Sequence, residues 1–540
     1  MALPLNPLRC LERAVTVFGR KSAIVCQGKR FSYAEFGDRC GRLASALKAL
    51  GIQRGDRIAY LSFNTHKLLE AYFGVVQAGA IVMPLNVRLS ARELSTILNH
   101  AEPPVLFFEH EFAPLLPAFR ASCPSVKHFI ALDDVADADL HYESLLQQYA
   151  PAPLDPFAVN DDDTAELFYT SGSTGDPKGV MLSNRALYLH AIAVAAIYTH
   201  PESVVDLHTI PLFHANGWGH AHASTMLGVT QVMVRRFEPA AVLGLVEQHK
   251  ATDMCLVPTM ANALLNVPNA DQFQLSSMRQ IVLGGAASSP PLIERLEKLF
   301  HCDVIGGYGL TESGPMISTA REKASVPYSS DSERWTRRAM TGWSFPGVTM
   351  RVVDTNMNDV PQDMKSIGEI VASCDWLMSG YYRDPEGTAA ALTGPRGEPG
   401  GVPGRAVWLH TGDMAVWDEE DFVLIVDRKK EIIISGGENI SSLEIEKVIY
   451  AHPAVLECAV VSAPDTAWGE VPVAIVVRKP GNTVDEYALT AHMAQSLSKF
   501  KLPRRIEFVE GPLPKTGTGK IRKMELRDPF WKDHAKRVQG

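Results

Sequence analysis

The residues best suited to chemistry lie in one loop that is rich in glycine and hydroxyl side chains, residues 169–180. Its sequence is Tyr-Thr-Ser-Gly-Ser-Thr-Gly-Asp-Pro-Lys-Gly-Val, and it overlaps a short apolar stretch, Leu167–Thr170, that predicts a strand. Glycines leave backbone N–H groups accessible, hydroxyls donate hydrogen bonds and Lys178 adds a positive charge, and these are the groups that bind phosphates. The loop is not a Walker A motif, because no Gly-Lys pair in the chain is followed by Ser or Thr. Taken alone, such a loop is more often a flexible turn.

Six further motifs decide between these two interpretations of the loop. In chain order they are Pro211–His214, Tyr308–Ser313, Thr411–Asp413, Asp427–Glu431, Ser435–Ile440 and Pro514–Lys520. With the first loop, this series resembles the motifs of the adenylate-forming (ANL) superfamily: acyl-CoA synthetases, adenylation domains of peptide synthetases and firefly luciferase. The resemblance extends over roughly residues 10–530. Each motif is weak by itself, but seven in the family's order are very hard to obtain by chance.

The resemblance implies a reaction in two steps. A carboxylate attacks the α-phosphorus of ATP, which gives an acyl-adenylate (acyl-AMP) and pyrophosphate, and a thiol then displaces AMP. Both reactants of the first step are anions, so the site must supply cations and aligned donors. The implied ATP and AMP ligands are Thr170, Ser171, Gly172, Ser173, Thr174, Gly175, Lys178, Gly285, Ala286, Tyr308, Gly309, Thr311, Asp413, Arg428 and Lys520. Glu312, with the Thr170 hydroxyl, would hold Mg²⁺.

The expected catalytic residues are Lys520, His214 and Glu312. By resemblance, Lys520 would bridge the substrate carboxylate and the α-phosphate. His214 would shape the path of the carboxylate, which is already ionised and needs no base. The group His208, His214, His220 and His222 lacks the spacing of a known metal-ligand set.

The acid to be activated is expected to have an uncharged tail. Peptide-synthetase domains usually carry Asp directly after the Phe of the acyl motif, whereas this chain has Phe213-His214, and a buried ammonium without a partner is costly. The implied acyl-binding residues are His214, Trp218, Gly309 and Met316. The motif looks most like those of medium- and long-chain fatty acyl-CoA synthetases. Aryl, short or branched acids are the alternative, as are loading of a separate carrier protein and, more remotely, a non-catalytic relative or a luciferase-like oxygenase.

Coenzyme A is the acceptor that the resemblance favours. The residues expected to bind it are Ser435, Gly436, Gly437, Glu438 and Trp468. Lys430 is expected to be the hinge of a lid that docks in two orientations, one for each step.

The elements that must position these residues alternate along the chain. Strand patterns occur at Arg57–Ser62, Val105–Phe108, Met254–Val257 and Gln280–Leu283, and helical patterns lie between them, as at Tyr33–Leu50 and Leu292–Phe300. This alternation predicts an α/β fold with parallel sheets. Two polar or Gly/Pro-rich segments, Arg321–Arg338 and Gly394–Gly404, predict surface loops.

The expected domains are a large N-terminal region, a hinge and a compact α+β lid. Residues 1–427 would form the AMP-binding region, with several subdomains, parallel sheets and a small β subdomain; residues 428–431 would form the hinge, and residues 432–530 the lid. The basic stretch Lys499–Arg527 is either a solvated face or a surface of this lid that meets a nucleotide.

Length and composition exclude several classes of protein. A chain of 540 residues is too long for a single hydrophobic core. Its composition, 46% hydrophobic and 21% charged residues, is typical of a globular protein. The net charge of −9 argues against nucleic acid as a partner. The eight cysteines form no CxxC pair, and no apolar run is long enough to span a membrane. We expect a cytoplasmic enzyme without a transmembrane segment, with a homodimer as one expected assembly.

Overall fold

The computed structural model divides into two compact units. It describes residues 3–136, 138–170, 177–196, 201–286, 288–394, 407–429, 431–435, 438–465, 468–515 and 521–532. Unit 1 comprises Met1–Met350, Ala372–Leu409 and Glu420–Phe422, and unit 2 comprises Arg351–Val371, His410–Glu419 and Val423–Gly540. These units are defined by compactness and combine separate segments of the chain. They do not test the predicted domain limits at 427 and 432, which stay predictions.

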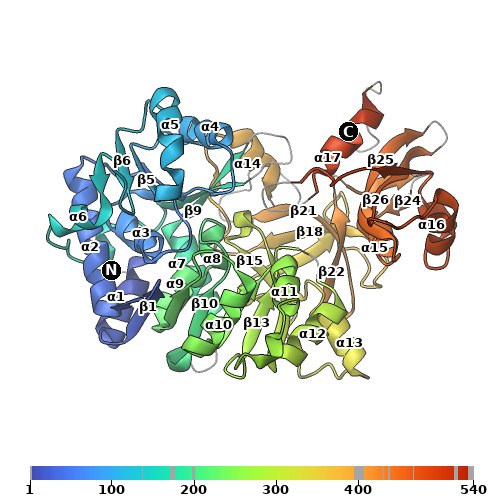
Figure 1. Cartoon of the computed structure of the whole chain (residues 1–540), viewed down its shortest axis with the longest axis horizontal. Helices are drawn as coiled ribbons and strands as arrows, with labels where there is room; N and C mark the ends of the chain where they lie inside the picture. The colour runs from blue at the N-terminus through green and yellow to red at the C-terminus, as the bar shows by residue number, and fades with distance from the viewer. Residues whose placement is uncertain are drawn as a thin grey trace. The chain divides into compact units, whose positions relative to one another are not determined.

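Unit 1 is built on two large sheets whose central strands are parallel (Figure 1). The first has the order β16 (Trp343–Ser344), β15 (Met316–Thr319), β14 (Asp303–Gly309), β13 (Gln280–Leu283), β12 (Asp253–Leu256), β10 (Val205–His208), β11 (Thr230–Met233), β1 (Ser22–Cys26) and β2 (Lys29–Ser32). The second has the order β19 (Gly380–Tyr381), β9 (Lys178–Ser183), β8 (Thr164–Thr170), β4 (Ile81–Pro84), β3 (Arg57–Leu61), β5 (Val105–Phe108), β6 (His128–Ala131) and β7 (Leu140–His141).

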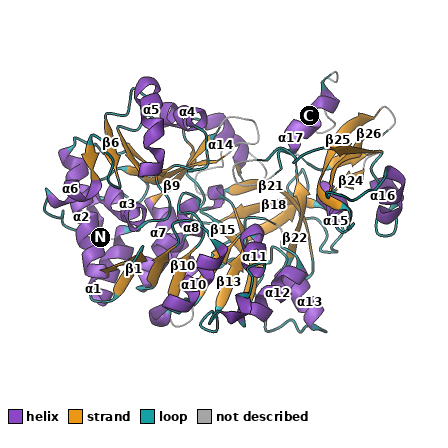
Figure 2. Cartoon of the chain, in the orientation of Figure 1, coloured by secondary structure: helices purple, strands orange, loops and turns teal. Residues whose placement is uncertain are grey.

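Helices cover both faces of each sheet, which gives alternating layers (Figures 1 and 2). The largest core joins both sheets through a shared helical layer: α1 (Leu8–Phe18), α2 (Tyr33–Ala49), α3 (His66–Gln77), α7 (Asn184–Ala195) and α9 (His220–Leu227). The outer face of the first sheet packs on α10 (Pro239–His249), α11 (Pro258–Leu265) and α12 (Pro290–Phe300). The outer face of the second packs on α4 (Ala91–Ala101) and α5 (Leu116–Ser122). Because both faces are covered, the inner strands are apolar runs such as Val-Leu-Phe-Phe in β5.

The predicted α/β fold is confirmed, and one predicted loop is wrong. The strand and helix patterns named above match β3, β5, β8, β12, β13, α2 and α12 within three residues. The segment Arg321–Arg338 was expected to be a loop throughout, but Asp331–Arg338 forms helix α13, capped by the Ser330 side chain. Its single large apolar residue, Trp335, donates to Glu297 of α12 at 2.9 Å. Ion pairs and this one indole therefore attach the helix to α12, and no apolar stripe is needed. Most of the predicted loop Gly394–Gly404 lies outside the described residues.

Unit 2 contains most of a third sheet and all of a fourth. The third has the order β17 (Thr349–Val353), β18 (Gly368–Ser373), β21 (Trp408–Trp417) and β20 (Leu392–Thr393), with β22 (Val423–Arg428) on β21. The fourth has the order β24 (Glu438–Ile440), β23 (Ile433–Ser435), β26 (Gly469–Arg478) and β25 (Val455–Asp465), with β27 (Arg505–Val509) on β26. Helices α15 (Ser442–Tyr450) and α16 (Glu486–Met493) cover one face of the fourth sheet, and α17 (Lys523–Trp531) packs on the other.

Several cations of the basic stretch are paired within unit 2. Lys501 pairs with Glu444, Lys515 with Glu457, and Lys523 with Glu446. These pairs favour a structural role for those lysines and leave the role of Lys520 open, because Lys520 lies outside the described residues. No helix within the described ranges combines the length and the apolar composition that crossing a bilayer requires.

A buried ion pair ties three helices of unit 1 together. Arg39 of α2 lies 2.6 Å from Glu70 of α3 and 2.9 Å from Glu143 of α6 (Tyr142–Gln147). Glu70 is only 1% exposed, and its other oxygen accepts the Tyr142 hydroxyl at 2.6 Å. Since a carboxylate out of water needs a cation, Arg39 sets the spacing of these helices.

Replacing Arg39 with Leu is expected to destabilise unit 1 strongly. The change leaves the buried Glu70 carboxylate without a cation, which lowers the free energy of unfolding by about 3–5 kcal/mol. The matched control is Arg54→Leu, since Arg54 pairs with Asp163 at 2.5 Å but is 64% exposed; an exposed pair contributes about 1 kcal/mol or less. Thermal unfolding of both variants measures the difference, and equal Tm losses would contradict the buried-pair interpretation.

Candidate active site

The predicted phosphate loop is bounded by two strands that pair side by side. In the second sheet, Thr170 at the end of β8 lies opposite Lys178 at the start of β9. The Lys178 ammonium is 3.3 Å from Asp384 and 4.6 Å from the centre of the Tyr381 ring. The predicted ligands Ser171, Gly172, Ser173, Thr174 and Gly175 lie outside the described residues.

Tyr381 brings the expected metal ligand next to this lysine. The Tyr381 hydroxyl donates to Glu312 at 3.0 Å, and Tyr381 itself pairs with Val180 of β9. Burial and the negative charge of Glu312 raise the pKa of Tyr381, so its hydroxyl keeps its proton and donates. Glu312 and Lys178 therefore both contact Tyr381. Sequence reasoning missed Tyr381 and Asp384, which lie about 70 residues from Glu312 and belong to no quoted motif.

The segment around Gly309 is fixed by a close backbone approach. A side chain on Gly309 would place its Cβ 1.6 Å from the Pro315 carbonyl oxygen, so only glycine fits. Tyr308 and Gly309 end β14, and Thr311 and Glu312 follow in the 3-10 turn η5 (Thr311–Ser313). Gly285 and Ala286 follow β13, and Gly285 has a left-handed backbone with φ of +74°.

His214 and Trp218 lie at an unusual backbone segment. This segment, Ala215–Gly219, follows His214 and includes Trp218, and all five of its residues have positive φ, from +42° to +86°. Before this segment, the Asn64 side chain donates to the carbonyls of His208 and Ile210 at 3.0 and 2.9 Å. Burial and the nearby Arg88 charge lower the pKa of His214 to about 4, so at pH 7 its imidazole is neutral.

A buried carboxylate holds the same segment from the second sheet. Glu166 of β8 is fully buried and accepts from Asn216 at 2.7 Å and from His222 at 2.7 Å. His222 lies on α9, directly after the left-handed residues. Glu166 thus links the strand that ends at Thr170 to the segment that carries His214 and Trp218.

A small cavity opens beside Trp218 and Met316. The volume of this cavity is about 20 Å³. Its walls are mostly apolar, and it is lined by Val194, Trp218, His220, Cys255, Gln280, Val282, Ile305, Met316, Thr319, Arg321 and Phe345. The Trp218 ring also faces Gly284 and Gly285, where an added Cβ would lie 3.0 and 3.4 Å from it. The structure therefore brings two of the predicted acyl-binding residues, Trp218 and Met316, to one cavity.

Unit 2 holds the predicted ribose residue in an ion pair. Asp413 of β21 is almost fully buried, and Arg428 lies opposite it on β22 with its Nε 2.7 Å from the carboxylate. The arginine both neutralises Asp413 and fixes its orientation. The expected hinge residue Lys430 lies outside the described residues.

The residues expected to bind coenzyme A are only partly described. Ser435 ends β23 and pairs with Glu438 and Gly469. Trp468 is about half exposed, and the Arg504 guanidinium lies 5.8 Å from its ring. Gly436 and Gly437 lie outside the described residues, as does Lys520; Lys515 and Ile521, on either side of the Lys520 segment, pair with each other.

Comparison with known proteins agrees with this geometry. Residues 11–382 match the family of AMP-binding enzymes, and residues 444–520 match the AMP-binding enzyme C-terminal domain. The chain belongs to the AMP-binding enzyme family. It is 38% identical to a long-chain-fatty-acid–CoA ligase of Thermus thermophilus over 97% of this chain and 96% of that protein. It is 35% identical to a peroxisomal butyrate–CoA ligase of Arabidopsis thaliana over 97% and 93% of the two chains.

A solved structure supports the same assignment. The anthranilate CoA ligase AuaEII in complex with anthranoyl-AMP superimposes with a TM-score of 0.83 at 26% identity, over 98% of both chains. The predicted superfamily and fold class are confirmed, and the chain is an enzyme of the AMP-forming acid–thiol ligase class.

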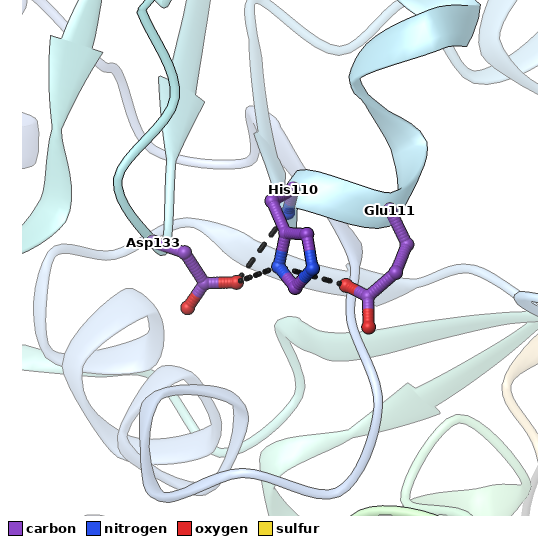
Figure 3. Close-up of side chains that lie close together, drawn as sticks. All are labelled: His110, Glu111 and Asp133. Carbon is purple, nitrogen blue, oxygen red and sulfur yellow. Dashed lines mark hydrogen bonds and ion pairs between the residues drawn. The ribbon is translucent and has the colours of Figure 1, made fainter.

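A second group of possible metal ligands lies elsewhere on this AMP-binding enzyme. Figure 3 shows His110, Glu111 and Asp133 pointing toward one another, with His110 Nδ1 3.1 Å from an oxygen of each carboxylate. Glu111 also pairs with Arg235 and Arg236 at 2.6 Å each. Because these arginines already balance the carboxylate, the cluster is better explained as an ion-pair network than as a metal site.

Tyr381→Phe is expected to weaken the use of ATP with Mg²⁺. The variant keeps the ring beside Lys178 but removes the hydroxyl that orients Glu312, and a hydrogen bond to a charged group contributes about 1.5–3 kcal/mol. We expect the rate of pyrophosphate release at limiting Mg²⁺ to fall about tenfold or more.

Tyr382→Phe is the matched control, because its ring packs on His100 instead. Recovery of the Tyr381→Phe activity by raised Mg²⁺ would support the orienting role. Equal effects of the two variants would contradict it.

Proposed function

We propose that this chain activates an uncharged carboxylic acid, a medium- or long-chain fatty acid, with ATP and Mg²⁺, and transfers the acyl group to coenzyme A. The products are acyl-CoA, AMP and pyrophosphate. The observation that carries the proposal is that Lys178 and Glu312 both contact Tyr381, with Thr170 opposite Lys178 at the end of β8.

This arrangement suits the charges of the first step. Lys178 supplies a cation for the terminal phosphates, and Glu312 with the Thr170 hydroxyl supplies hard oxygen donors, the kind that Mg²⁺ prefers. The metal would add charge neutralisation at the phosphates. Thr311 would donate to the α-phosphate and Tyr308 would stack on adenine. In unit 2, Asp413, held by Arg428, would accept from the ribose hydroxyls.

The proposed acid lies with its carboxylate near His214 and Gly309 and its tail toward Trp218 and Met316. A neutral His214 does not attract the carboxylate as a cation would, which supports a positioning role. The apolar walls of the cavity favour an uncharged tail. The alternative is an aryl, short or branched acid, and the similarity to ligases named for butyrate and anthranilate supports it.

The second step is proposed to use residues of unit 2. Ser435, Gly436, Gly437, Glu438 and Trp468 would line the path of coenzyme A, and the exposed Trp468 ring suits contact with a mobile pantetheine arm. A separate carrier protein is the alternative acceptor. Assembly as a homodimer and a cytoplasmic location stay predictions.

Pyrophosphate release across a panel of acids tests this function. The panel runs from C2 to C16 and includes aromatic acids and amino acids. We expect aliphatic acids to cause pyrophosphate release and amino acids to cause none. When coenzyme A is present, AMP and acyl-CoA should form in equal amounts. Activity with amino acids alone would contradict the proposal, and activity with aromatic acids alone would favour the alternative.

Lys520→Ala is expected to separate the two steps. Loss of one strong electrostatic contact in the transition state costs about 10²–10³ in rate, so acyl-AMP formation should slow by that factor. Thioester formation from supplied acyl-AMP and coenzyme A should be nearly unchanged. Lys515→Ala is the matched control, because Lys515 lies five residues earlier and pairs with Glu457.

Lys430→Pro should have the opposite pattern. It restricts the expected hinge, so the second step should slow while acyl-AMP still forms. Equal loss of both steps in Lys520→Ala would show that the two-orientation interpretation is wrong.

A further inference from the structure

A cysteine, a histidine and an aspartate meet under the helical layer of unit 1. Asp206 of β10 lies opposite Asp253 of β12 in the parallel register, and Cys255 is two residues further along β12. Alternate residues of a strand face the same side, so Asp206 and Cys255 both face the layer of α7 and α9. His220, the first residue of α9, lies between them.

The distances connect the three side chains in series. The His220 Nδ1 is 2.9 Å from an Asp206 oxygen, and the His220 Nε2 is 3.4 Å from the Cys255 sulfur. The same Asp206 oxygen accepts the Ser224 hydroxyl at 2.8 Å. An aspartate cannot donate here, so Nδ1 carries a proton and Nε2 is left to take one from the thiol. This is the order of nucleophile, base and orienting carboxylate.

The electrostatics of the group agree with its geometry. Burial disfavours a charged imidazole, but Cys255 and Asp206 outweigh it and raise the pKa of His220 well above its usual value. Asp206 in turn stays ionised despite burial, because His220, His208 and Ser224 lower its pKa to about 2. A carboxylate and an imidazolium are therefore compatible in this place.

The thiol borders a cavity. Cys255 is only 5% exposed, yet it lines the cavity beside Trp218 and Met316, as does His220. A cavity of about 20 Å³ holds a water molecule, so the sulfur borders a space that is not filled by side chains.

We propose that Cys255, His220 and Asp206 form a reactive thiol site that takes small, uncharged, soft electrophiles, namely alkenes activated by a carbonyl group. The Cys255 sulfur attacks the β-carbon of the alkene, and a sulfur–carbon bond forms as the carbon–carbon π bond breaks. The electron pair of that bond takes the proton from His220 Nε2 onto the α-carbon, so nothing is released. Asp206 acts as a positioning residue for His220. The step needs neither ATP nor coenzyme A and goes beyond the proposed ligase function.

The other cysteines provide internal comparisons. Cys374 and Cys302 are more exposed than Cys255, but burial raises the pKa of Cys374 to about 12 and also raises that of Cys302. Cys10 is fully buried, and burial raises its pKa to about 12. Accessibility alone predicts that Cys374 and Cys302 react first, whereas the contact of the Cys255 sulfur with His220 predicts that Cys255 reacts first.

Acrylamide is the probe that distinguishes these two predictions. The folded full-length chain is incubated with acrylamide at pH 7, and adducts at each cysteine are followed by peptide mass spectrometry. We expect Cys255 to react about tenfold or more faster than Cys374 and Cys302, and Cys10 not to react. Faster reaction at Cys374 or Cys302 would overturn the proposal without any variant.

A variant tests the role of the imidazole. His220→Gln keeps a polar side chain but cannot take the thiol proton, so adduct formation at Cys255 should slow about tenfold or more while Cys374 is unchanged. Ser224→Ala, which removes the neutral donor to Asp206, is the control and should leave the Cys255 rate within about threefold. An unchanged Cys255 rate in His220→Gln would also overturn the proposal.

Discussion

The five left-handed residues Ala215–Gly219 are the constraint on which the candidate site depends. Only glycine adopts this conformation without cost, and other residues lose about 1–2 kcal/mol each, yet three of these five are not glycine. Surrounding contacts must offset that cost. The buried Glu166 carboxylate provides one of them by accepting from Asn216. This contact helps to hold the turn, and with it the relative placement of His214 and Trp218.

The same logic explains why the candidate residues of unit 1 gather where strands end. Thr170 ends β8, Gly309 ends β14, and Gly285 follows β13. The carboxyl ends of β13 and β14 lie at one edge of the first sheet and that of β8 at an edge of the second, and such carboxyl edges are where ligands bind in open α/β folds. Glycine at position 309 is required by the Pro315 carbonyl, which packs against it. The edge is therefore defined by backbone packing, and the polar side chains are added to it.

The sequence was sufficient to find the local motifs that carry the candidate residues. Lys178, Glu312 and Trp218 lie in short motifs, and the strand and helix patterns follow from apolar periodicity. It could not reveal Tyr381, because the pairing of β19 with β9 is a long-range contact without a local signal. Helix α13 was missed for a related reason, since ion pairs to distant residues replace the apolar stripe that periodicity detects.

Two buried carboxylates of unit 1 show how an ion pair becomes reactive or stays structural. Glu70 and Asp206 each accept from one neutral hydroxyl, and each is also bonded to a nitrogen-bearing side chain, so both are well satisfied. The donor to Glu70 is Arg39, which does not lose its proton in proteins, and that pair can only hold helices together. The donor to Asp206 is His220, whose second nitrogen contacts Cys255 at the wall of a cavity. A proton can therefore move along this group, and the change from guanidinium to imidazole is what separates a structural pair from one that can do chemistry.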